Sequence, residues 1–90
     1  MKTVSITVKG RVQGVFYRQS TKEKAVELGI TGKVSNLDNG DVQIIASGAE
    51  EKIDQFIEWC RRGPSKARVT GLEIKELPPQ LFSYFQIVRF

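Results

Sequence analysis

The stretch GRVQGVFYR, residues 10–18, links a strand to a helix and thereby decides how the first part of the chain folds. Before it, Val4, Ile6 and Val8 alternate with polar side chains, which is typical of a strand with one buried face. The stretch contains two glycines and delivers Arg18 to the beginning of the helix. Because unpaired N–H groups give a helix N-terminus partial positive charge, an arginine there is unfavourable unless an anion lies between them. We therefore expect an anion at this loop.

Downstream of the loop, the pattern predicts a helix and then a hairpin. Apolar and small residues recur at helical spacing over residues 17–28, and Gly29 is placed to cap that helix. Two strand-like runs, residues 30–37 and 41–47, flank the tripeptide Asp38-Asn39-Gly40. Asn-Gly between such runs is a strong hairpin signal, because both residues tolerate positive φ.

The second half of the chain repeats a helix and a strand. Ser47 followed by Glu50 indicates a capping box at the start of a second helix, which the Arg-Arg-Gly-Pro run at residues 61–64 ends. Residues 67–77 predict another strand. Its apolar residues change phase, so we expect a β-bulge near Thr70-Gly71.

The order of these elements predicts the fold class. A short final strand over residues 83–89 completes the pattern, at a sheet edge. The order βαββαβ predicts an α+β, ferredoxin-like sandwich with two helices on one face of an antiparallel sheet and a short extra C-terminal strand. With 90 residues and 40% hydrophobic content, we expect one domain over residues 1–90. The other face of the sheet is left to solvent or to a ligand.

The amino-acid composition limits which partners and catalytic groups the protein can have. Fourteen Lys and Arg against ten Asp and Glu give a net charge of +4, which favours anionic partners without choosing among phosphate, nucleic acid and membrane. The chain has no histidine, the usual general base at neutral pH, and its single Cys60 can form no internal disulfide. No metal site is expected. Residues 1–10 alternate in polarity and no apolar run is long enough to span a membrane, so we expect a cytoplasmic protein.

The loop can be interpreted in two ways. In one interpretation, successive N–H groups of this glycine-containing turn converge on one anion and, with the side chain of Arg18, form a phosphate-binding cradle. Gly14 would allow the anion to come close to the backbone. Taken alone, the loop is more simply a turn, since glycine-rich loops often bind nothing. It lacks the lysine of a Walker loop, and a cysteine phosphatase would need arginine where Lys66 stands. Cys60 lies on an apolar helical stripe, so we assign it to the core.

A second run changes this balance. Residues 32–36 read Gly-Lys-Val-Ser-Asn, and Gly40, Val42 and Gly48 follow. With both runs, the chain resembles the acylphosphatase family, small proteins that hydrolyse the carboxyl–phosphate bond, over almost its whole length. The first run carries the family signature at Val8, Gly10, Val12, Gln13, Gly14, Val15 and Arg18.

The resemblance implies a site and a reaction. It implies that Arg18 and Asn36 are the catalytic residues, with Asn36 orienting the attacking water, and that no cofactor is used. It implies a phosphate-binding loop of Gln13, Gly14, Val15, Phe16, Tyr17 and Arg18. It also implies a small-molecule acyl phosphate as substrate and inorganic phosphate as product and competitive inhibitor. We expect a monomer, although the short terminal strand could pair with a neighbour.

This reaction suits residues that are not bases. Phosphoryl transfer has a loose transition state, which a protein stabilises mainly by positioning the reactants and neutralising charge. The departing carboxylate is the base of an acid with a pKa of about 4, so no general acid is required. The resemblance implies that the substrate phosphate accepts the proton of the water.

Three residues depart from the family pattern. Tyr17 stands where phenylalanine is usual and is expected to add a hydroxyl beside the cradle. Lys33 replaces an aromatic residue and Ser35 a larger one. Both are expected to face away from or flank Asn36, so they bear on substrate affinity and local stability more than on the reaction type.

Two other function classes remain open from sequence. An RNA-binding domain of the same fold would stack bases on aromatics of its central strands, yet residues 3–9 and 41–47 contain none, and Trp59 is placed in the second helix for packing. We therefore expect neither a nucleic-acid nor a membrane partner. A sensor that binds phosphate without turnover would use the same cradle, and Asn36 distinguishes it from an enzyme.

Overall fold

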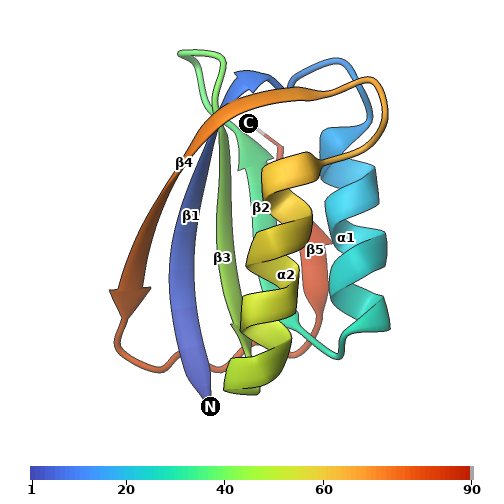
Figure 1. Ribbon diagram of the computed structural model, residues 1–90. Helices are drawn as coiled ribbons and strands as arrows, with labels where there is room; N and C mark the ends of the chain where they lie inside the picture. The colour runs from blue at the N-terminus through green and yellow to red at the C-terminus, as the bar shows by residue number, and fades with distance from the viewer. Residues whose placement is uncertain (90) are drawn as a thin grey trace.

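The chain folds into a five-stranded sheet and two helices (Figure 1). The computed structural model describes residues 1–89. The elements, in chain order, are β1 (Lys2–Arg11), α1 (Tyr17–Glu27), β2 (Thr31–Asn36), β3 (Val42–Gly48), α2 (Glu50–Arg62), β4 (Arg68–Leu77) and β5 (Phe85–Ile87). This order confirms the α+β, ferredoxin-like prediction, including the short extra C-terminal strand.

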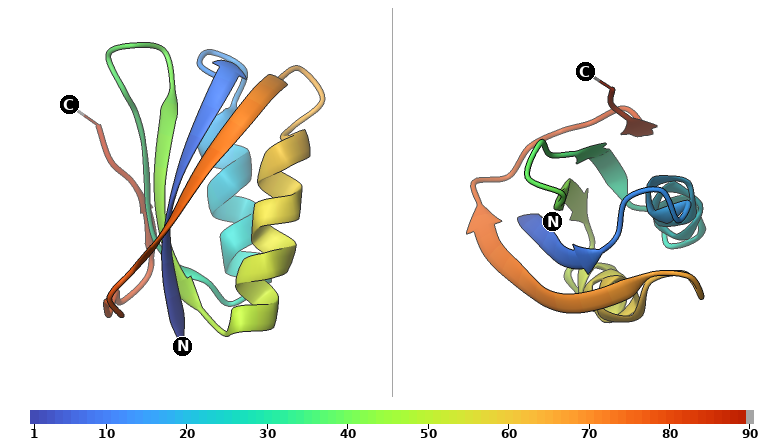
Figure 2. Two further views of the ribbon diagram at one scale, coloured as in Figure 1. Left: turned by 60° about the vertical axis from the view of Figure 1, so that its left-hand side comes forward. Right: turned by 90° about the horizontal axis from the view of Figure 1, so that it is seen from above.

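The sheet has the order β4-β1-β3-β2-β5. Its first four strands pair antiparallel, and β5 pairs parallel with the outer edge of β2. Both helices cover the same face of the sheet, and the opposite face carries no helix in the described chain (Figure 2). The β1–α1 loop and the β2–β3 hairpin come together at one end of the molecule (Figure 1).

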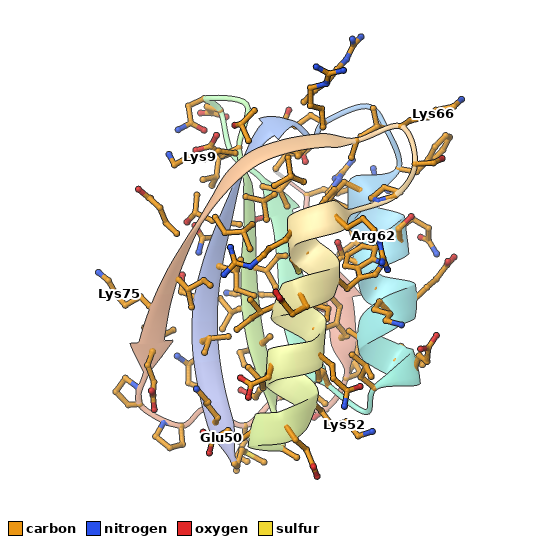
Figure 3. All side chains as sticks on the ribbon, in the orientation of Figure 1. Lys9, Glu50, Lys52, Arg62, Lys66 and Lys75 are labelled. Carbon is orange, nitrogen blue, oxygen red and sulfur yellow. The ribbon has the colours of Figure 1, made fainter. Side chains whose placement is uncertain are left out.

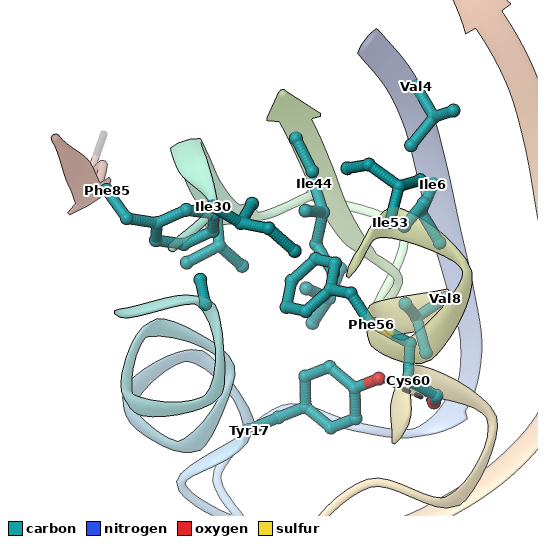
Figure 4. Close-up of a cluster of buried hydrophobic side chains, with 14 of the residues drawn as sticks. Val4, Ile6, Val8, Tyr17, Ile30, Ile44, Ile53, Phe56, Cys60 and Phe85 are labelled. Carbon is teal, nitrogen blue, oxygen red and sulfur yellow. Dashed lines mark hydrogen bonds between the residues drawn. The ribbon is translucent and has the colours of Figure 1, made fainter. Parts of the chain in front are cut away.

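The core lies between the helices and the covered face of the sheet (Figure 4). From the two central strands, Val8 and Ile44 are fully buried, and α2 contributes Ile53 and Phe56. Each such side chain stabilises the fold by roughly 1.5–3 kcal/mol relative to exposure. Because a slip of one residue would turn every strand side chain to the other face, this burial also fixes the register of the sheet.

A β-bulge sits where β1 enters the loop. Lys9 pairs with Gly71, but the next residue, Gly10, pairs with Val69, so Thr70 has no partner of its own. This confirms the bulge expected near Thr70-Gly71. Gly10 has φ 124°, and a Cβ there would collide with the carbonyl oxygen of Arg68, so only glycine fits. A bulge increases local twist and re-aims the chain that leaves the strand.

The second helix does not begin with the expected capping box. Ala49 is the N-cap, and Ser47 is a buried residue of β3 opposite Thr3. The hydroxyls of Ser47 and Thr3 share a hydrogen bond of 2.7 Å. The capping-box prediction is therefore wrong, because a buried hydroxyl needs a partner and the strand supplies one. The acidic residues Glu50 and Glu51 favour the helix N-terminus instead.

The hydroxyl of Tyr17 points into the core and not beside the loop, which corrects the expectation from sequence. It donates a hydrogen bond of 2.7 Å to the carbonyl oxygen of Cys60, and burial raises the pKa of the phenol above its ordinary value (Figure 4). Pro64 has no N–H, so it cannot satisfy that carbonyl as the next helical turn would. The hydroxyl thus ties the start of α1 to the end of α2.

Replacing Tyr17 by phenylalanine tests this link. Tyr17→Phe leaves the buried carbonyl of Cys60 without its donor, so the free energy of unfolding should fall by about 1–2 kcal/mol. Urea denaturation measures that change. Phosphate binding should stay within twofold of the parent chain, since the hydroxyl faces away from the loop. An unchanged stability together with altered phosphate binding would show that the hydroxyl acts at the loop instead.

Candidate active site

The β1–α1 loop is shaped by two residues with left-handed backbones. Gly14 has φ 75°, and Phe16, the N-cap of α1, has φ 61° and ψ 25°. For a residue with a Cβ, this conformation costs about 1–2 kcal/mol. The ring of Phe16 is 75% exposed, so its burial does not offset that cost. Strain held in this way is typical of ligand-binding turns, in which consecutive N–H groups converge on an anion.

The backbone N–H groups of residues 14–18 are available to a ligand. Within residues 1–89 they donate no hydrogen bond to another group of the chain. Among the described residues, the first turn of α1 carries no acidic side chain, although a carboxylate is the usual complement to a helix N-terminus. Half-buried Arg18 lies in that turn instead. The loop therefore combines several unpaired donors with two sources of positive charge, which fits an anion.

Gln13 joins the loop to the β2–β3 hairpin. Its side-chain Nε2 donates hydrogen bonds to the backbone oxygens of Leu37, at 2.8 Å, and Asp41, at 2.9 Å. Lys9, labelled in Figure 3, adds a 3.4 Å ion pair to the Asp41 carboxylate. Because one donor group holds both ends of the hairpin turn, Gln13 fixes where the end of β2 lies relative to the loop. The sequence pattern carries no sign of this, since the acceptors are backbone oxygens.

Asn36 is the last residue of β2. Alternation along the strand places it on the same face as the fully buried Val34. Its Oδ1 is buried and has no hydrogen-bond partner among residues 1–89. Leaving such an acceptor unpaired costs about 1–3 kcal/mol, so the amide oxygen is suited to accept a hydrogen bond from a ligand or a water.

Two adjoining hollows bring these groups together. The first, of about 430 Å³, is lined by the loop, including Gly14, Phe16 and Tyr17. The second, of about 460 Å³, is lined by Gln13 and the hairpin residues Leu37 and Asp38. Three residues line both hollows, namely Arg18, Asn36 and Arg89. The two residues expected to be catalytic, Arg18 and Asn36, therefore share one region with most of the expected loop, while the side chain of Val15, also expected there, packs against the core.

Lys33 and Ser35, two of the three residues that depart from the family pattern, lie on the other face of β2. Lys33 pairs with Ile45 and Ser35 with Gln43, one position out of phase with Asn36. Their side chains therefore point to the face of the sheet that the helices leave open. This agrees with the expectation that the two residues face away from Asn36.

Cys60 is a core residue, as expected. Its side chain is fully buried, and burial raises the pKa of the thiol to about 12. A thiol with that pKa is protonated at neutral pH and cannot act as a nucleophile. Over residues 1–89, no three His, Cys, Asp or Glu side chains group so that they could hold a metal ion. In the same range, no helix is long and apolar enough to cross a membrane.

Arg89 was missed by the sequence reasoning. The alternation of side chains along the last strand could have identified it. Phe85 and Ile87 face the core, and Arg89, two residues further on, falls on the same face. The direction of β5 was needed as well. Only a parallel pairing with β2 brings the end of the chain to Asn36.

Comparison with known proteins gives one consistent result. The family model described as Acylphosphatase matches residues 4–87. An acylphosphatase of Methylococcus capsulatus is 54% identical over 77 residues, which are 86% of this chain and 84% of that protein. One of Vibrio parahaemolyticus is 42% identical over 98% of both chains. The solved structure of an acylphosphatase from Coxiella burnetii is 39% identical, with a TM-score of 0.94 over 97% of this chain and 92% of that one.

The link made by Gln13 can be tested by removing it. Gln13→Ala deletes two hydrogen bonds, so the free energy of unfolding should fall by about 1–2 kcal/mol and amide exchange in the hairpin, residues 37–41, should accelerate. Urea denaturation and hydrogen exchange measure the two effects. Gln55→Ala, the same change on exposed α2 surface, is the control. Equal exchange in the two variants would contradict a link between loop and hairpin.

Proposed function

The chain belongs to the acylphosphatase family and hydrolyses acyl phosphates, and we propose that it does so without a metal ion, with the phosphoryl group held in the 13–18 loop. In this proposal Arg18 completes the phosphate cradle and Asn36 orients the attacking water. The observation that carries it is that Asn36, whose buried Oδ1 has no hydrogen-bond partner among residues 1–89, lines the same two hollows as Arg18.

The cradle is supported by the donors of the loop. A phosphoryl group offers three non-bridging oxygens, and Arg18 can bind two of them with its planar fork. The N–H groups of residues 14–18 supply the remaining hydrogen bonds. Because the left-handed backbones of Gly14 and Phe16 already hold these donors in place, little reorganisation is needed when charge develops in the transition state.

The water is oriented by an acceptor and not by a base. Oδ1 of Asn36 accepts a hydrogen bond from one O–H of the water, which leaves a lone pair of the water oxygen to attack phosphorus. The bond between phosphorus and the acyl oxygen breaks, and its electron pair leaves with the carboxylate. The proton of the water passes to a phosphoryl oxygen, and the products are a carboxylate and inorganic phosphate. No side chain gains or loses a proton.

Metal independence follows from where the charge is neutralised. The phosphoryl charge meets Arg18 and the positive end of α1, which take the place that a divalent cation would hold. The leaving carboxylate is the base of an acid with a pKa of about 4 and departs without protonation. Positioning by the loop and by Asn36 supplies the rest of the acceleration.

Three further properties belong to the proposal. Inorganic phosphate, the product, should compete with substrate because it fits the same cradle. The protein should act as a monomer, since the loop, Arg18 and Asn36 of one chain already line the site. We place it in the cytoplasm, where its single, fully buried cysteine needs no oxidising environment.

The roles of Arg18 and Asn36 can be separated by kinetics with benzoyl phosphate in the presence of EDTA. The parent chain should retain full activity with the chelator. Arg18→Gln should raise KM and lower kcat together, because the contact serves both bound substrate and transition state, and inhibition by phosphate should weaken in parallel. Asn36→Ala should reduce kcat by about 100-fold or more while leaving phosphate inhibition nearly unchanged.

Lys33→Gln is the matched control for Arg18→Gln, since it removes one positive charge from the opposite face of the sheet. It should change neither parameter by more than twofold. Loss of the parent activity in EDTA would disprove the metal-free mechanism. Unchanged phosphate inhibition in Arg18→Gln would show that the cradle lies elsewhere.

A further inference from the structure

We infer that Arg89 binds the acyl part of the substrate and favours acyl phosphates whose acyl group carries a second anionic group, such as a carboxylate. The inference rests on the proposed function, because it extends the same site from the phosphoryl group to the rest of the substrate. It concerns binding alone and adds no chemical step.

The pairing of β5 places Arg89 beside Asn36. Strand β5 runs parallel to β2, with Val34 opposite Ile87. The alignment continues beyond the strand, because the N–H of Val88 donates a 2.8 Å hydrogen bond to the carbonyl oxygen of Val34. Two residues further along both segments, Asn36 and Arg89 are neighbours across the sheet edge. Alternation then puts the side chain of Arg89 on the face that holds Asn36.

The segment before Arg89 is anchored in the core. Phe85 is 3% exposed and packs edge to face against Phe56, with ring centroids 6.1 Å apart. Gly32 lies opposite Phe85 and donates its N–H to the carbonyl oxygen of Tyr84 at 3.1 Å. The approach of Arg89 to the site is therefore set by a buried aromatic pair and by backbone hydrogen bonds, not by its own long side chain.

The two arginines line the hollows from different parts of the chain. Arg18 comes from the first turn of α1 and Arg89 from the end of the edge strand, and both line both hollows with Asn36. Within residues 1–89, neither forms an ion pair with a carboxylate. Asp38 is exposed and lines the second hollow. Its single negative charge does not balance the two positive charges of the arginines.

The size of the site indicates that the two arginines bind different parts of the substrate. A hollow of about 430 Å³ has the volume of a small-molecule site and exceeds what a phosphoryl group and a water fill. The phosphoryl oxygens already have Arg18 and the loop N–H groups as donors. Phe16 and Ile87 line the first hollow beside Arg89 and offer apolar contact to a short carbon chain. A chain that ends in an anion matches this arrangement.

Binding of two phosphonates, which cannot be hydrolysed at an acyl bond, tests the inference without turnover. 4-Phosphonobutyrate carries a carboxylate at the end of its chain, whereas butylphosphonate has a methyl group there and the phosphonate as its only anionic group. By isothermal titration calorimetry, the parent chain should bind the carboxylate-bearing compound about tenfold more tightly. Arg89→Gln should remove this preference and leave the affinity for butylphosphonate within twofold. Lys33→Gln, a charge removed from the opposite face, should keep the preference.

Three results would overturn the inference: no preference in the parent chain, a preference that survives in Arg89→Gln, or an equal loss for both compounds. The last would assign Arg89 to the phosphoryl group. Turnover of succinyl phosphate against butyryl phosphate gives the second measurement, with the same expected loss of preference in Arg89→Gln. If neither is hydrolysed, the proposed function fails, while the phosphonate titration still decides the role of Arg89.

Discussion

The rest of the site depends on one electrostatic constraint, the concentration of unpaired donors and positive charge at the beginning of α1. The N–H groups of residues 14–18 have no acceptor among residues 1–89, the helix dipole points its positive end at them, and Arg18 adds a full charge. Such a cluster is stable when an anion sits within it. The strained backbone of Phe16 shows that the fold holds this arrangement in place.

The surrounding structure serves to place that cluster against Asn36. The bulge at Thr70 redirects β1 as it enters the loop, and the two hydrogen bonds of Gln13 hold the hairpin that follows Asn36. The hydroxyl of Tyr17 fixes the base of α1 to the end of α2. These contacts link elements that are distant in sequence, and each uses a donor or acceptor that the local secondary structure leaves free.

What the sequence could predict was set by local physics. Alternation and helical spacing gave every strand and helix, and the phase change near Val69 gave the bulge, because these patterns depend on neighbours along the chain. The loop was recognisable because Arg18 is locally unfavourable where it stands. Ser47 was misassigned because its hydroxyl is satisfied by Thr3, which is remote in sequence. Tyr17 and Arg89 depend likewise on tertiary contacts, to Cys60 and along the edge of β2.

We propose that the 13–18 loop holds the phosphoryl group. Titration of the ¹⁵N-labelled protein with inorganic phosphate, followed by two-dimensional NMR, tests this most directly. We expect saturable shifts that are largest at the backbone amides of residues 14–18 and at the guanidinium Nε–H of Arg18, with the amide group of Asn36 also affected. Shifts centred on another surface, with these amides unmoved at saturation, would contradict it.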